Sequence, residues 1–114
     1  MTPTELAERI LWLGIEGPTG LWEILWELQL PADNQTIAMI GGVVEQLLDE
    51  GYVGLYEEHD PRDPLRPLTA EDGASALRAE RNWFEPSVGA TCVRFETTSL
   101  GQSRYWGQLP GKDR

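Results

Sequence analysis

The stretch from Asn34 to Tyr56, NQTIAMIGGVVEQLLDEGYVGLY, constrains the fold of this chain more than any other segment. Apolar residues recur in it at intervals of three and four as far as Leu48, which is the spacing of an amphipathic helix. Asp33 or Asn34 can cap the start of this helix, and Gly51 stands where a C-terminal glycine is expected. We therefore predict a helix over residues 34–50 that runs into a strand formed by YVGLYEE.

The predicted helix has one apolar and one polar face, and two glycines lie in its middle. A glycine inside a helix costs on the order of 1 kcal/mol relative to alanine. Either Gly41 makes room for Trp22 or Trp26 and Gly42 is incidental, or an outward Gly42 leaves a flat spot that a partner backbone can approach. The core face comprises Ile37, Ile40, Val44, Leu47 and Leu48, and the outer face comprises Gln35, Ala38, Gly42, Glu45, Gln46 and Asp49.

Two shorter helices are predicted before it. Thr2 or Thr4 can cap the first helix, which Gly14 and the turn EGPTG should end. Leu6, Ile10 and Leu13 share its core face, whereas Leu11 and Trp12 fall away from that face. The segment LWEILWEL (21–28) forms the second helix, and we expect its two tryptophans, Trp22 and Trp26, to pack in the core.

The second half of the chain reads as an insertion followed by a strand. EEHDPRDPLRPL holds three prolines and is expected to be a loop, and Thr69 with Asp72 three residues on predicts a short helix. TCVRFETT (91–98) alternates and is rich in β-formers, which predicts a strand. SLGQSRYWGQL then forms a short turn or helix, and residues 110–114 are expected to fray.

This order of elements, with the segments VVEQLLDEGYVGLY and VRFETTSLGQSRY, resembles the winged helix-turn-helix superfamily, in particular MarR- and PadR-type regulators. The resemblance covers residues 5–56 and 91–105. It implies a single α+β domain over 1–114, with three helices and a two- or three-stranded antiparallel wing. Residues 57–91 would then be an insertion in the wing, decorated by Trp83 and Phe84.

The charge distribution bears on the partner. The formal net charge is −10, and between Arg9 and Arg62 the chain has ten acidic residues and no basic side chain other than His59. Such a segment opposes contact with DNA phosphates, which supply most of the affinity in DNA binding. We therefore expect a basic protein partner, bound by the outer face of helix 34–50 and by Trp12. That set is Gln35, Ala38, Gly42, Glu45, Gln46, Asp49 and Trp12.

The resemblance itself implies the alternative, a dimeric transcriptional regulator that binds DNA through helix 34–50 and the wing. Asn34, Gln35 and Thr36 would then lie towards base edges. Arg62, Arg66 and Arg94 could form a basic wing. A homodimer is left open under both hypotheses, and it would have to use the first helix, where Leu11 and Trp12 are candidates, or the C-terminal RYWGQL.

Catalytic chemistry has little support in the sequence. The single Cys92 excludes an internal disulfide and a cysteine-based zinc site, and no base is placed beside it for nucleophilic work. His59 in EEHDPRD could bind a metal, although a solvated loop is the favoured interpretation. We expect no enzyme, no cofactor and no metal. No signal peptide or apolar span is evident in the sequence, so a cytoplasmic location without membrane contact is expected.

Overall fold

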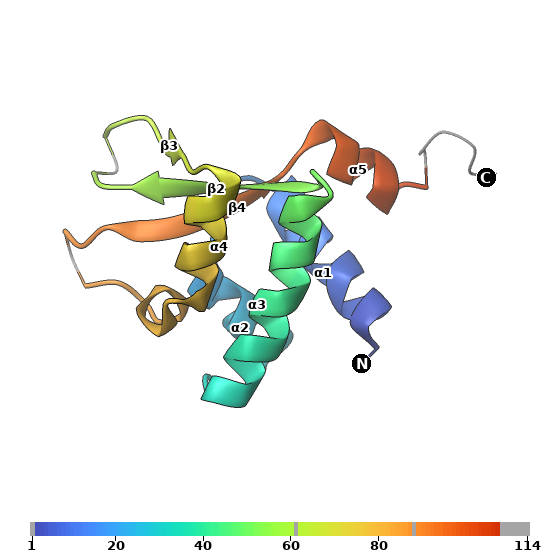
Figure 1. Ribbon diagram of the computed structural model, residues 1–114, viewed down its shortest axis with the longest axis horizontal. Helices are drawn as coiled ribbons and strands as arrows, with labels where there is room; N and C mark the ends of the chain where they lie inside the picture. The colour runs from blue at the N-terminus through green and yellow to red at the C-terminus, as the bar shows by residue number, and fades with distance from the viewer. Residues whose placement is uncertain (1, 61, 88, 108–114) are drawn as a thin grey trace.

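A four-stranded antiparallel sheet forms one layer of the fold, and helices pack below it in Figure 1. The computed structural model describes residues 2–60, 62–87 and 89–107. The spatial order of the strands is β1-β4-β2-β3, so β4 pairs with both β1 and β2. Their bounds are β1 Thr19–Gly20, β2 Val53–Glu58, β3 Arg66–Pro67 and β4 Cys92–Thr97. The α+β class is confirmed, and β3 is a strand in the stretch expected to be a loop.

The register of β2 and β4 follows from their alternating side chains. Leu55 lies opposite Phe95 and Val53 opposite Thr97, and all four are buried. The neighbouring positions, such as Tyr56 opposite Arg94, face the other side of the sheet and are less buried. This alternation confirms the two strands predicted at residues 52–58 and 91–98, each shorter by one or two residues.

Helix α1 (Pro3–Ile15) begins with a reciprocal cap between Thr2 and Glu5. Two expectations for this helix are wrong. Leu11 was expected to lie away from the core face, but it is fully buried because β4 and α5 cover that side of α1. Gly14 lies within the helix, where its missing side chain lets β4 approach closely. A Cβ built on Gly14 would come within 2.8 Å of both the Thr97 amide nitrogen and Phe95 Cε2.

Helices α2 (Leu21–Leu28) and α3 (Asn34–Asp49) match their predicted ranges closely. Asp33 caps α3 by accepting a hydrogen bond from the Thr36 amide at 2.8 Å, and Gly51 adopts a φ of +79° after its end. Trp22 is buried as expected, whereas Trp26 is 56% exposed. The core placement of Trp26 was wrong, because the buried face of α2 consists of Leu21, Trp22, Ile24 and Leu25 and Trp26 lies outside it.

Residues 57–91, which the resemblance assigns to an insertion, contribute to the core. They form α4 (Ala70–Arg78) and a 3-10 helix, η1 (Glu80–Trp83), and both contact α3. Thr69 caps α4 by accepting from the Asp72 amide at 3.1 Å, as its sequence predicted. Trp83 is only 1% exposed, and its indole Nε1 donates to the Leu77 carbonyl at 2.9 Å. The expectation that Trp83 decorates the wing was therefore wrong, whereas Phe84 is exposed.

A fifth helix, α5 (Ser99–Tyr105), follows β4 and packs against α1. The Tyr105 ring stacks on Trp12 with centroids 5.8 Å apart and meets the edge of Trp106 at 4.9 Å. The described residues thus contain five α-helices: the three predicted before the first long strand, the short helix predicted after Thr69, and α5 where a short turn or helix was expected. None of these helices is long and apolar enough to cross a membrane. The predicted frayed tail, residues 110–114, lies outside the described residues.

Candidate functional site

The outer face of α3 is the first part of the candidate site. Helical spacing places one residue per turn along this face, and the side chains there are polar or small. Five of the six positions that the sequence assigned to the outer face are exposed, and Glu45 is half-buried. The exposed five are Gln35, Ala38, Gly42, Gln46 and Asp49. The structure therefore brings these predicted residues onto one surface.

The insertion turns one side of this surface into a groove. Helix α4 and the start of η1 lie alongside α3, as Figure 1 shows for the two helices. Between them runs a groove of about 400 Å³, which we call the α3–α4 groove. Its lining residues are Asn34, Ile37, Ala38, Gly41, Gly42 and Glu45 from α3, and Leu77, Arg78 and Glu80 from the insertion.

Ionic groups stand on both walls of the groove. Arg78 Nη2 lies 3.1 Å from Glu45 Oε1 and 3.4 Å from Glu45 Oε2, while its side chain remains 72% exposed. With the Asn34 amide turned so that its nitrogen faces the carboxylate, it donates to Glu80 at 3.1 and 3.3 Å. Among the described residues no Arg, Lys or His lies within ion-pair distance of Glu80. The groove therefore carries two carboxylates and one guanidinium.

The two glycines of α3 have different surroundings. A Cβ on Gly41 would lie 3.4 Å from the Leu77 carbonyl oxygen and 3.6 Å from Trp83 Cζ2. Gly41 thus makes room for the insertion, and not for Trp22 or Trp26 as one hypothesis held. A Cβ on Gly42 would meet nothing within 4 Å, which confirms its outward position. Gly42 leaves part of the groove wall as bare backbone.

Trp12 does not belong to this surface. It lies on α1, where it stacks on Tyr105 and borders shallow pockets lined by residues of α1, α2 and α5. It is part of an exposed aromatic cluster with Tyr105 and Trp106. The predicted partner set therefore divides into the outer face of α3 and a separate aromatic cluster on α1 and α5.

Arginines from the second half of the chain neutralise much of the acid-rich first half. Of its ten acidic residues, six lie within 4.0 Å of an arginine nitrogen among the described residues: Glu23, Glu45, Glu50, Glu57, Glu58 and Asp60. The arginines involved all come from residues 62–104. The absence of arginine and lysine between Arg9 and Arg62 in the sequence therefore does not leave Glu45 and Glu50 without basic neighbours, whereas among the described residues no basic side chain lies within ion-pair distance of Asp49.

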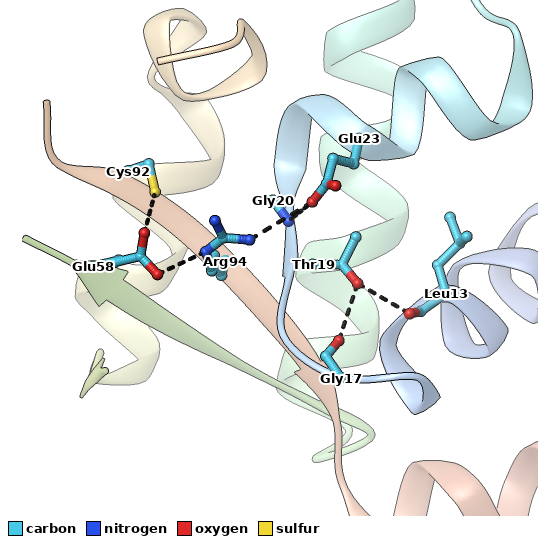
Figure 2. A network of polar contacts seen from close by, with 8 residues as sticks. All are labelled: Leu13, Gly17, Thr19, Gly20, Glu23, Glu58, Cys92 and Arg94. Atoms are coloured by element: carbon cyan, nitrogen blue, oxygen red, sulfur yellow. Dashed lines mark hydrogen bonds and ion pairs between the residues drawn. The ribbon is translucent and has the colours of Figure 1, made fainter. Parts of the chain in front are cut away.

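Arg94 contacts two of these carboxylates, those of Glu58 and Glu23 (Figure 2). Its Nε donates to Glu58 at 3.0 Å, and its Nη1 lies 3.7 Å from Glu23, whose carboxylate accepts the Gly20 amide at 2.6 Å. The guanidinium also lies over the Trp22 ring, 5.5 Å from its centroid. This network joins β4, β2 and the start of α2, and it leaves the Arg94 side chain only 24% exposed.

The alternative DNA-binding set does not form a free basic surface. Arg62 pairs with Asp60 at 2.9 Å, and Arg66 pairs with Glu57, which also accepts from His59. With Arg94 held as described, each of these three arginines faces a carboxylate. Asn34, Gln35 and the half-buried Thr36 lie in the first turn of α3, where the Thr36 amide is taken by Asp33. Asn34 and Gln35 are exposed, but the Asn34 amide already donates to Glu80.

Cys92 and His59 each contact a carboxylate at the end of β2. Burial raises the pKa of the Cys92 thiol, and the nearby Glu58 carboxylate raises it further against the opposing effect of Arg94. A thiol with a raised pKa is a poor nucleophile at neutral pH. His59 bridges Glu57 and the Thr91 hydroxyl at 2.7 and 3.1 Å. The described residues contain no group of three His, Cys, Asp or Glu side chains that could hold a metal ion.

Sequence reasoning missed the wall of the groove that the insertion supplies, namely Leu77, Arg78 and Glu80. One signal could have located it. The run ASALRAERNWF places Leu77 and Trp83 among mostly small and polar residues, and large apolar side chains in such a stretch indicate burial. No local pattern, however, indicates that these two residues pack on α3.

Comparison with known proteins gives no relative for this arrangement: no family model, curated protein or solved structure matches the chain.

Proposed function

We propose that this chain is a non-catalytic, protein-binding regulator or adaptor with a winged helix-turn-helix fold, and that it binds a basic protein partner through the α3–α4 groove. An antitoxin- or immunity-type role would fit a small acidic chain of this kind. The proposal separates the fold, the docking face and the chemistry of the partner, and each has its own support.

The strand arrangement supports the winged-helix assignment. A short strand, β1, lies between the first two helices and pairs with β4, while β4 pairs along its whole length with β2 after α3. Three helices followed by such a hairpin are the core of a winged helix. The chain departs from that plan in α4 and η1, which occupy the link between β2 and β4.

The groove is the observation that carries the functional proposal. The exposed side of α3 presents bare backbone at Gly42, and α4 supplies a second wall beside it. A concave surface with an apolar floor and polar edges is typical of sites that receive a side chain or a helix from a partner. The net charge of −10 favours a basic partner and speeds its approach.

The same observations weaken the alternative of DNA binding. A recognition helix must enter the major groove, which admits a single helix, yet α4 lies alongside α3 for part of its length. The described arginines of the wing are already paired with carboxylates. Phosphate contacts would have to replace these ion pairs, and that exchange reduces the affinity that each arginine can add.

The experiment compares three tagged chains in cells of the source organism: wild type, Gly42→Leu and Gln102→Leu. Both variants add one exposed leucine to a helix, but Gln102 lies on α5, away from the groove. Quantitative mass spectrometry of the captured proteins should give a partner with a basic surface. Its recovery should fall strongly with Gly42→Leu and stay unchanged with Gln102→Leu. Equal recovery with all three chains would remove the α3 face from consideration.

A duplex titration separates the two functions. Fluorescence anisotropy with random duplex DNA at low salt should give no saturable binding. Tight binding that weakens steeply with salt, and that is lost in Arg66→Ala, would favour the DNA-binding alternative over the protein-binding function.

A further inference from the structure

The α3–α4 groove combines an apolar floor with charged edges. Ile37, Gly41 and Leu77 line its floor, and the carboxylates of Glu45 and Glu80 stand at its edges. Its volume of about 400 Å³ lies at the lower end of the roughly 300–1,000 Å³ usual for ligand pockets. A long charged side chain needs both features, because its methylene stem packs on apolar surface while its head requires a polar partner.

The charges at the edges favour a cation. Glu45 already shares its charge with Arg78, whereas among the described residues Glu80 receives only the neutral Asn34 amide. The groove is therefore left with one excess negative charge, and it lies on a chain with a net charge of −10. An anion entering the groove would face two carboxylates and gain a single guanidinium, so it is disfavoured.

The shape of the groove and the geometry of its carboxylate favour an arginine side chain over other cations. Gly42 adds no side chain to the wall, and Ala38 adds only a methyl group, so a partner backbone can approach α3 closely here. A planar guanidinium can make two parallel hydrogen bonds to one carboxylate, which a lysine ammonium cannot match. Glu80 is exposed, and its two oxygens, which share the Asn34 amide, keep further lone pairs that can accept from a guanidinium.

We propose that the α3–α4 groove binds an arginine side chain of a basic protein partner, with its methylenes over Gly41 and Gly42 and its guanidinium on Glu80. This inference rests on the proposed function, since it names the group through which the partner docks. Arg78 remains paired with Glu45, and the two side chains form the edge of the groove opposite Glu80.

The test is an NMR titration of the isotopically labelled full chain with N-acetyl-arginine N-methylamide. The matched control ligand is the citrulline analogue, which has the same length and no charge. Saturable shifts of the Gly41, Gly42 and Glu80 amides are expected with the arginine ligand and at most weak shifts with citrulline. Glu80→Gln should weaken arginine binding at least about tenfold, whereas Glu71→Gln, an exposed carboxylate of α4 outside the groove, should leave it unchanged.

Three results would overturn the inference: no saturable shifts at these amides, equal binding of the citrulline ligand, or unchanged binding by a folded Glu80→Gln chain. The amide spectrum of each variant reports whether it is folded. If these results occur while Gly42→Leu still abolishes capture of the protein partner, the proposal of a bound arginine is refuted, but the α3–α4 groove remains the proposed docking surface. If partner capture is also unaffected by Gly42→Leu, both proposals fall.

Discussion

Gly14 and Gly42 offer a paired prediction, because the same substitution in two helices should change stability in opposite directions. Both glycines lie inside an α-helix, so replacing either with alanine gains about 1 kcal/mol of helix propensity. At Gly42 the new methyl group meets nothing within 4 Å. We therefore expect Gly42→Ala to raise the free energy of unfolding by about 1 kcal/mol.

At Gly14 the packing costs exceed this gain. The new Cβ would collide with the Thr97 hydroxyl and lie 2.8 Å from Phe95 Cε2. Overpacking of this kind costs about 1–3 kcal/mol. The buried Thr97 hydroxyl, which donates to the Leu11 carbonyl at 2.7 Å, would also be displaced, and an unsatisfied buried group costs about 1–3 kcal/mol. Against the gain of about 1 kcal/mol from propensity, Gly14→Ala should lose roughly 1–5 kcal/mol.

Urea unfolding followed by tryptophan fluorescence measures both variants against the wild type. The midpoint should rise for Gly42→Ala and fall for Gly14→Ala, with the slope unchanged in each. In thermal scans each kcal/mol corresponds to a shift of about 4 °C for a domain of this size. A stabilised Gly14→Ala chain would refute the close packing of α1 on β4, and a strongly destabilised Gly42→Ala chain would refute the outward position of Gly42.

Three further predictions concern Trp83, Glu57 and Cys92. Trp83→Ala should cost about 3–5 kcal/mol in urea unfolding, whereas Phe84→Ala should stay within about 0.5 kcal/mol; similar losses would contradict the core role of Trp83. Burial raises the pKa of Glu57, but hydrogen bonds from Arg66 and His59 outweigh it and hold the pKa below its ordinary value. The Glu57 carboxylate therefore stabilises the fold above its unfolded-state pKa, and this stability is lost as the pH falls through the lower folded-state pKa. In Glu57→Gln the free energy of unfolding should accordingly decrease less as the pH falls below about 4.5 than it does in the wild type. An acid limb identical to that of the wild type would exclude this contribution. The buried Cys92 thiol, with its raised pKa, should react with a disulfide reagent only on unfolding, and immediate labelling of the native chain would contradict its burial.

Local patterns predicted the elements whose signals are local. The start of α3 at Asp33, its end before Gly51 and the cap at Thr69 each depend on residues within four positions, and the structure confirms all three. The strands β2 and β4 could equally be predicted from the alternation of apolar and polar residues along them. These features could be predicted because neighbouring residues determine them.

Long-range packing could not be predicted in this way. Leu11 is buried because α5 and β4 close over α1 from the far end of the chain. The groove has the same cause, since Arg78 meets Glu45 across 33 residues of sequence. Sequence reasoning therefore placed the α3 wall of the candidate site, with Ala38, Gly42 and Glu45, and missed the α4 wall. An acid-rich segment likewise gives no sign of which arginines will lie beside it in space.

Direct titration of the captured partner tests the central claim, that the α3–α4 groove is a protein-docking face. Calorimetry with the purified partner should give a dissociation constant at least about tenfold weaker for Gly42→Leu than for the wild type, a loss of about 1.4 kcal/mol or more. Gln102→Leu should match the wild type within about twofold. Equal affinity for Gly42→Leu and the wild type would contradict the claim.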